Sequence, residues 1–178
     1  MSYKNLVIID NEKISKKNND FYCDNFEART SEDFSKDFDV TVIARKSKID
    51  RAHLIKLNKV EIASNIFHFL FKIFKTFKKK ETIYLIIAIN PYTFFSYLFL
   101  FFFKKKIFVY LRSDGHEEYK AIFGFIGPII YSLMFNIVTF KTNIITCQKR
   151  LFTKRESYLV FPSELNSLWL DNKKPALL

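Results

Sequence analysis

The segment 106–120, KIFVYLRSDGHEEYK, decides the fold prediction because it joins a buried strand to a polar turn. Residues 107–110 form a continuous apolar and aromatic run, which is typical of a strand covered on both faces of a parallel sheet. Asp114-Gly115 is a turn signal, and the acidic Glu117 and Glu118 suit the positive N-terminal end of a helix. The segment therefore predicts a strand, a turn and a helix.

This turn has two interpretations. Its polar residues either cap the helix or form a site, because ligands bind at the carboxyl ends of strands in open α/β sheets. Asp114 could orient His116 or share its charge, and either side chain could accept a proton from a hydroxyl. The density of titratable groups in so short a turn favours a site.

The rest of the chain repeats the alternation of strand and helix. Apolar runs predict strands at 6–9, 40–44, 59–63, 82–89, 107–111, 143–147 and 158–161. Helices are expected at 21–36, 65–80, 92–103, 121–140 and 162–170, and 14–19 is expected to be a polar loop. At least five strand–helix units predict the α/β class, a doubly wound parallel sheet that is Rossmann-like and forms a single domain.

Charge is concentrated in the middle of the 178-residue chain. Residues 45–106 hold 14 basic and 3 acidic residues, a net charge of +11, interleaved with many of the 22 phenylalanines. Such a segment attracts anionic lipid head groups or phosphates. Within 65–80, one face carries His68, Lys72, Lys75, Thr76 and Lys79, and the other side is filled by Phe67, Leu70, Phe71, Phe74 and Phe77. Both a helix that covers a sheet and one partly embedded in a membrane surface fit this pattern.

Residues 121–140 form an uncharged stretch of twenty residues, long enough to span a bilayer. Gly124, Gly127 and Pro128 interrupt it early, so we expect a buried or membrane-dipping helix. Cys23 and Cys147 lie far apart without a CxxC pair, which favours reduced thiols in a cytoplasmic protein.

The usual cofactor motifs are missing from the sequence. It has no GxGxxG, no GxxxxGK[ST] and no metal-binding spacing among its three histidines. No serine or cysteine lies in a recognisable nucleophile elbow. We therefore expect no cofactor and no metal. Nucleic acid is also disfavoured as a partner, because the phenylalanines fall on apolar faces and not on a stacking platform.

Several pieces, taken in order, resemble the N-terminal half of a bacterial glycosyltransferase of the GT-B type, in the broad glycosyltransferase family 4. They are 8–11 (IIDN), 14–18 (ISKKN), 21–25 (FYCDN), 42–48 (VIARKSK), 90–93 (NPYT), 109–115 (VYLRSDG), 117–120 (EEYK) and 162–166 (PSELN). The succession runs through nearly the whole chain, whereas each motif alone is weak. This chain departs from the family pattern at Lys16–Asn19, where many members carry glycines.

The resemblance implies an acceptor-binding domain that faces a second, nucleotide-sugar-binding domain across a cleft. It places the turn after the first strand and the turn around Asp114 at that cleft. Asp114 and His116 are then the candidate catalytic residues. The candidate substrate-binding residues are Lys16, Asn18, Asn19, Asp20, Asn90, Tyr92, Arg112 and Glu117.

By the same resemblance, residues 1–171 are the acceptor domain, and 172–178 are a linker and the start of a missing C-terminal donor domain that binds most of the nucleotide-sugar. The expected function is sugar transfer to a lipid-linked or polysaccharide acceptor, by a protein that is cytoplasmic, peripheral at the inner face of the cell membrane and inactive as a fragment. The alternative is a small non-catalytic membrane-associated protein anchored through 121–140.

Overall fold

The computed structural model describes residues 4–23, 33–57, 59–151 and 157–160. The described strands are β1 (Asn5–Lys17), β2 (Asp20–Cys23), β3 (Asp39–Lys46), β4 (His53–Ile55), β5 (Val60–Ala63), β6 (Thr82–Ile87), β7 (Lys106–Leu111), β8 (Asn143–Thr146) and β9 (Ser157–Leu159). The described helices are α2 (Ile66–Thr76), α3 (Pro91–Phe102), α4 (Gly115–Phe123) and α5 (Gly127–Thr139), with short 3₁₀ turns at Gly124–Ile126 and Lys149–Leu151. The predicted helix at 162–170, the domain boundary at 171 and the segment 172–178 lie outside the described residues.

Most of the sheet is parallel. Its parallel strands lie in the order β5-β3-β1-β6-β7-β8-β9, so β1 pairs with β3 on one side and β6 on the other. Counted along the chain this is the order 3-2-1-4-5-6-7, which begins as Rossmann sheets do. The α/β prediction is confirmed, and the arrangement is compatible with a Rossmann-like domain. The sheet is mixed, because β2 and β4 add antiparallel pairs.

The strands build two hydrophobic cores, one on each face of the sheet. Along β1, Val7 and Ile9 join the core under the helices, whereas Leu6 and Ile8 join the opposite core. β1 and β3 are therefore buried on both faces over their apolar runs, as predicted. In β7 only the helix-facing residues are buried, and Phe108 and Tyr110 on the other face are half-buried.

The region after the first apolar run differs from the prediction. β1 continues to Lys17, and Asn18 and Asn19 turn the chain into the antiparallel β2, so 14–19 is not a loop and the helix expected at 21–36 does not begin at 21. Ile14 and Cys23 are buried together in the second core, which favours the strand. Asn18 takes φ 57°, a conformation that asparagine tolerates. Residues 24–32 lie outside the description.

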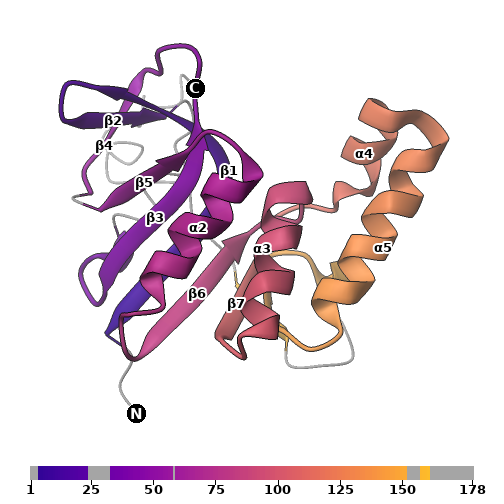
Figure 1. The fold of residues 1–178 in the computed structure, drawn as a ribbon. Helices are drawn as coiled ribbons and strands as arrows, with labels where there is room; N and C mark the ends of the chain where they lie inside the picture. The colour runs from indigo at the N-terminus through magenta and orange to yellow at the C-terminus, as the bar shows by residue number, and fades with distance from the viewer. Residues whose placement is uncertain (1–3, 24–32, 58, 152–156, 161–178) are drawn as a thin grey trace, which may run out of the picture.

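Helices α2, α3 and α5 lie over one face of the sheet (Figure 1). The buried face of α2 is not the one that was predicted. Phe69, Ile73 and Thr76 are buried, whereas Phe67 is 80% exposed. Thr76 can be buried because its hydroxyl donates to the Ile73 carbonyl (2.6 Å) and lies 3.0 Å from the Tyr84 hydroxyl. A polar side chain with satisfied hydrogen bonds thus points to the core.

The stretch expected to form one helix at 121–140 folds into a helical hairpin. α4 ends at Phe123, the chain turns through Gly124–Ile126, and α5 runs back beside it (Figure 1). The rings of Tyr119 and Tyr131 lie 5.2 Å apart across the hairpin. A Cβ added at Gly127 would lie 1.9 Å from the Tyr119 carbonyl oxygen, so only glycine permits this close approach.

The hairpin also bears on the question of a membrane span. Gly115–Thr139 is long and apolar enough to cross a membrane by length and composition, and most of it is exposed. The longer arm, α5, has 13 residues and rises only about 20 Å, whereas the hydrocarbon core of a bilayer is about 30 Å thick. In this fold neither arm reaches across a bilayer.

We predict that Gly127→Ala destabilises the protein by about 1–3 kcal/mol, since the added methyl group must push two backbones apart. The free energy of unfolding measured in urea tests this. Ala121→Ser, which adds an atom on the exposed side of the same hairpin, is the control and should change stability by no more than about 0.5 kcal/mol. Equal stability of Gly127→Ala and the wild type would contradict the close approach.

Candidate functional site

Polar side chains gather at the carboxyl edge of the parallel strands. Asn11 belongs to the extension of β1, Arg45 to the end of β3, Asn90 follows β6, Asp114 follows β7 and Gln148 follows β8. Parallel strands bring all their carboxyl ends to one edge, which is where open α/β sheets bind ligands.

The most connected group at this edge joins Asp114, His116 and Ser132. Asp114 caps α4, and its Oδ1 accepts a hydrogen bond from the His116 backbone N–H at 3.1 Å. The same oxygen contacts His116 Nδ1, and His116 Nε2 lies 2.8 Å from Ser132 Oγ on α5. The side chains of Asp114 and His116 are 22% and 34% exposed, so the group is half-buried and open to solvent.

The directions of these hydrogen bonds depend on the tautomer of His116. An ionised Asp114 carboxylate only accepts, and in the matching tautomer His116 Nδ1 donates to it while Nε2 accepts from the Ser132 hydroxyl. A carboxylate, an imidazole and a hydroxyl in series can draw a proton from a hydroxyl group, which is general-base chemistry. Ser132 was not predicted, because it lies on the other arm of the hairpin.

Aromatic packing holds this group in place. The His116 ring meets the Tyr131 ring edge-on, with centroids 4.7 Å apart. A Cβ at Gly115 would lie 2.2 Å from the Tyr131 ring, so glycine is needed in the turn. Burial raises the pKa of Tyr131, and burial together with the Glu118 charge raises the pKa of Tyr119 to about 12. Both phenols are neutral at physiological pH.

The other predicted residues of this turn, Arg112 and Glu117, have different surroundings. The Arg112 carbonyl accepts from Cys147 Sγ at 3.1 Å and from Gln148 Nε2 at 3.0 Å, which ties the loops after β7 and β8 together. Glu117 is exposed in the first turn of α4, where the helix dipole favours a negative charge.

Asn90 and Tyr92 lie where the strand order reverses between β1 and β6. The Asn90 side chain caps α3 by accepting from the Thr93 N–H at 3.1 Å. The Arg45 guanidinium lies 4.4 Å from the Tyr92 ring centroid, and it donates to Asn11 Oδ1 at 3.2 Å. Arg45 and Asn11 were missed, although the position of Arg45 directly after a buried run is the signal that singled out the Asp114 turn.

The remaining predicted residues, Lys16, Asn18, Asn19 and Asp20, form the turn between β1 and β2. All four are exposed, and Lys16 Nζ lies 5.6 Å from the Phe21 ring centroid. Figure 1 shows this hairpin at the opposite end of the sheet edge from α4. The structure thus brings Asp114 and His116 together and separates them from the Lys16–Asp20 turn. No group of three metal-ligating side chains occurs within the described chain.

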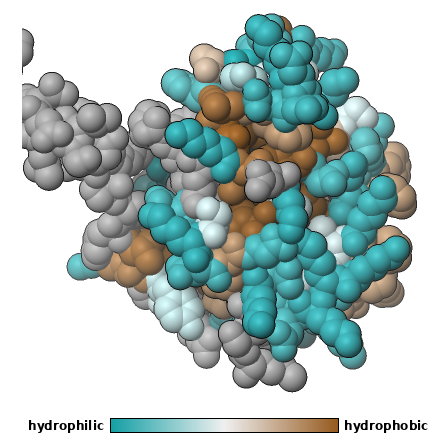
Figure 2. Space-filling view, turned by 90° about the vertical axis from the view of Figure 1, so that its left-hand side faces the viewer, coloured by the Kyte–Doolittle hydropathy of each residue, from teal (hydrophilic) through white to brown (hydrophobic). Residues whose placement is uncertain are grey.

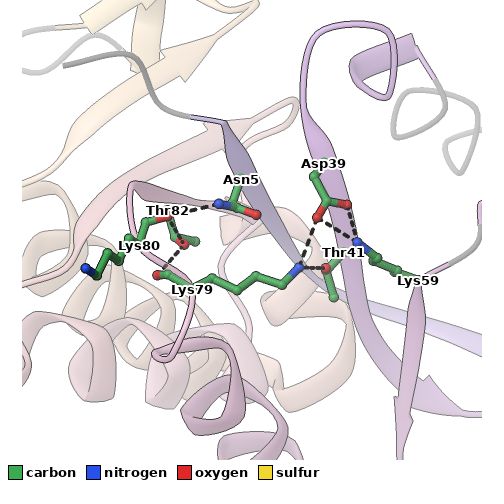
Figure 3. Close-up of polar contacts among 7 residues, drawn as sticks. All are labelled: Asn5, Asp39, Thr41, Lys59, Lys79, Lys80 and Thr82. Carbon is green, nitrogen blue, oxygen red and sulfur yellow. Dashed lines mark hydrogen bonds and ion pairs between the residues drawn. The ribbon is translucent and has the colours of Figure 1, made fainter.

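Lysines on and near α2 pair with carboxylates of β3 and β5. Lys59 Nζ lies 2.6 Å from both Asp39 oxygens, and Lys79 Nζ lies 3.5 Å from Asp39 and 3.1 Å from Thr41 Oγ1 (Figure 3). Lys72 Nζ bonds Glu61 at 2.5 Å. Two of the lysines expected to face anionic lipid are therefore partly neutralised by the protein itself.

Comparisons of the chain with protein-family models, curated protein sequences and solved structures give no match.

The Asp39 pairs predict a pH-dependent contribution to stability. The hydrogen bond from Lys59 is the main cause that holds the Asp39 pKa below its usual value of 3.8. A carboxyl whose pKa is lower in the folded state stabilises the fold above the unfolded pKa, and this contribution fades as the pH falls through the folded pKa. Asp39→Asn should therefore lower the free energy of unfolding at pH 7 but not at pH 2.

The expected loss at pH 7 is roughly 0.2–1 kcal/mol, because solvent screens a carboxylate that is 43% exposed. Urea unfolding across this pH range measures it. Asp33→Asn is the matched control, since among the described residues Asp33 pairs with the nearby Lys36 and its side chain is 78% exposed. A loss that stays equally large at pH 2 would show that the ion pairs are not its origin.

Proposed function

We propose that this chain is the acceptor-binding half of a membrane-associated glycosyltransferase of the GT-B type. It would act in the transfer of a sugar from a nucleotide-sugar to a hydroxyl on a lipid-linked or polysaccharide acceptor. The observation that carries the proposal is the Asp114–His116 pair at the carboxyl end of β7, because this pair can take up the proton that the acceptor hydroxyl loses. The order of motifs in the sequence and the strand order of the sheet support the same family.

In the proposed step the acceptor hydroxyl lies beside His116 Nε2, in the position that the Ser132 hydroxyl occupies in the free protein. The acceptor oxygen forms a bond to the sugar carbon as the bond from that carbon to the nucleotide diphosphate breaks. His116 takes the proton, and the Asp114 carboxylate stabilises the imidazolium that results. The nucleotide diphosphate leaves into the donor domain.

The other residues of the edge suit acceptor binding. Tyr92 offers a ring, and Arg45 offers a guanidinium that can bind a phosphate or carboxylate. Asn90 follows β6, and Arg112 follows the neighbouring strand β7. The donor nucleotide would bind mainly the second domain, so this half needs no cofactor of its own.

The helical layer supports a location at the membrane. Large apolar side chains on its outer surface are exposed, among them Phe67 on α2, Phe102 on α3 and Phe125, Ile129 and Leu133 in the hairpin. Apolar patches of this kind mark sites of interaction with membranes or partners. Seen from the side of β2 and β4, hydrophilic residues surround an apolar area (Figure 2). The proposed location of the protein is the cytoplasmic face of the cell membrane.

The second candidate is a non-catalytic membrane-associated protein anchored through residues 121–140. The exposure of Phe125, at 82%, favours it. In that case the Asp114–His116–Ser132 group only fixes the two arms of the hairpin to each other.

Substitutions in the turn separate the two functions. In the polypeptide that carries the donor domain as well, Asp114→Asn and His116→Ala should each lower sugar transfer by about 10²–10⁴-fold, the usual contribution of a general base. Lys120→Ala, an exposed neighbour on α4, is the control. Product formation from a nucleotide-sugar is measured, with circular dichroism to check folding. Wild-type turnover of both folded site variants would show that the turn is only a helix cap.

A further inference from the structure

A groove runs between α3 and α5 on the outside of the helical layer. It consists of two adjoining hollows of about 390 and 570 Å³, which share Leu98, Phe101 and Lys141. The first is lined mostly by apolar and aromatic side chains, with Tyr97, Ile137, Phe140 and the polar Asn136 completing it. Its size falls within the range of roughly 300–1,000 Å³ that is usual for ligand pockets.

Three lysines border the groove. Lys104 and Lys105 lie in the turn between α3 and β7, and Lys141 follows α5. Lys105 Nζ lies 4.2 Å from the Phe77 ring centroid, and Lys141 Nζ lies 5.7 Å from the ring centroids of Phe101 and Phe140. Among the described residues, no carboxylate pairs with any of the three.

This arrangement differs from that of Lys72 on α2 and Lys79 just after it, which pair with carboxylates of the protein. Lys105 and Lys141 instead lie over aromatic rings, as Lys75 on α2 does. The faces of such rings attract cations but do not cancel their charge. The groove therefore combines an apolar floor with a concentrated positive charge at one end.

We propose that this groove binds an anionic phospholipid, with the acyl chain between α3 and α5 and the phosphate among Lys104, Lys105 and Lys141. The inference deepens the proposed function and rests on it for the membrane location. The site is separate from the acceptor site, because Lys104 and Lys105 precede β7 and Asp114 follows it. A strand of six residues separates these ends by about 20 Å. The bound lipid holds the protein at the membrane and is not the sugar acceptor.

The chemistry of the groove favours this occupant over the others. A free phosphate would use the lysines and leave the apolar lining in water. A neutral lipid would use the lining and leave the positive charge uncompensated. A second copy docked by twofold symmetry would bring its own three lysines against these three, and like charges across an interface are repulsive.

Binding to vesicles tests the proposal. The protein is sedimented with vesicles of phosphatidylcholine alone and with vesicles that also contain phosphatidylglycerol, and binding is expected only to the second kind. Each lysine removed should weaken it about fivefold, so Lys141→Gln should bind more weakly than Lys120→Gln, which changes an exposed lysine outside the groove. The triple variant Lys104→Gln/Lys105→Gln/Lys141→Gln should lose binding almost completely.

A second pair of variants tests the apolar part. Ile137→Asn changes a residue that lines the groove, and Leu133→Asn changes one on the same helix outside it, with side chains 38% and 62% exposed. Weaker binding by Ile137→Asn alone supports the groove. Equal losses from the two variants would assign binding to the general apolar surface and overturn the proposal.

Other results would overturn it as well. They are equal binding to both kinds of vesicle and a dimer in size-exclusion chromatography that only Ile137→Asn dissociates. Circular dichroism checks that each variant is folded. The assay needs no turnover, so its failure leaves the sugar-transfer proposal standing, and a failed turnover assay leaves the lipid result unchanged.

Discussion

The burial of β1 on both faces and along both edges is the constraint on which the rest of the structure depends. β1 pairs with β3 on one side and with β6 on the other, and its alternate side chains enter the two cores. A central strand of this kind forces the chain to cross the sheet between β5 and β6, which α2 does. That crossing reverses the strand order and places Arg45 and Tyr92 side by side.

Local patterns predict the centre of this fold better than its periphery. The buried runs of β1, β3, β6 and β7 are continuous and apolar, so their length and composition suffice to predict them as strands. The β1–β2 hairpin was missed because β2 is held on its other side by β4, some thirty residues later. The buried face of α2 was missed because the Thr76 hydroxyl can be buried only with a hydrogen-bonding partner. That partner, Tyr84, lies on β6 and not on the helix.

In the candidate site, too, contacts between residues close in sequence could be predicted and contacts between distant residues could not. Asp114 and His116 are two residues apart, so their contact follows from the turn that contains them. Ser132 reaches His116 only because the chain reverses between α4 and α5, and that reversal relies on Gly124 at φ 64° and on Gly127. Two of the chain's three glycines, Gly115 and Gly127, thus serve one helix–helix contact. The site and the apolar tip of the hairpin are parts of one unit.

The position of β1 also has a consequence for synthesis on the ribosome. Its register joins Ile9 to Ile86, so the second neighbour of β1 is translated 77 residues after it. At about 5–20 residues per second, the strand waits roughly 4–15 s for that partner. During this interval one edge of a strand that is apolar on both sides has no hydrogen-bonding partner from β6. An unpaired apolar edge of this kind is the feature that exposes a nascent chain to aggregation.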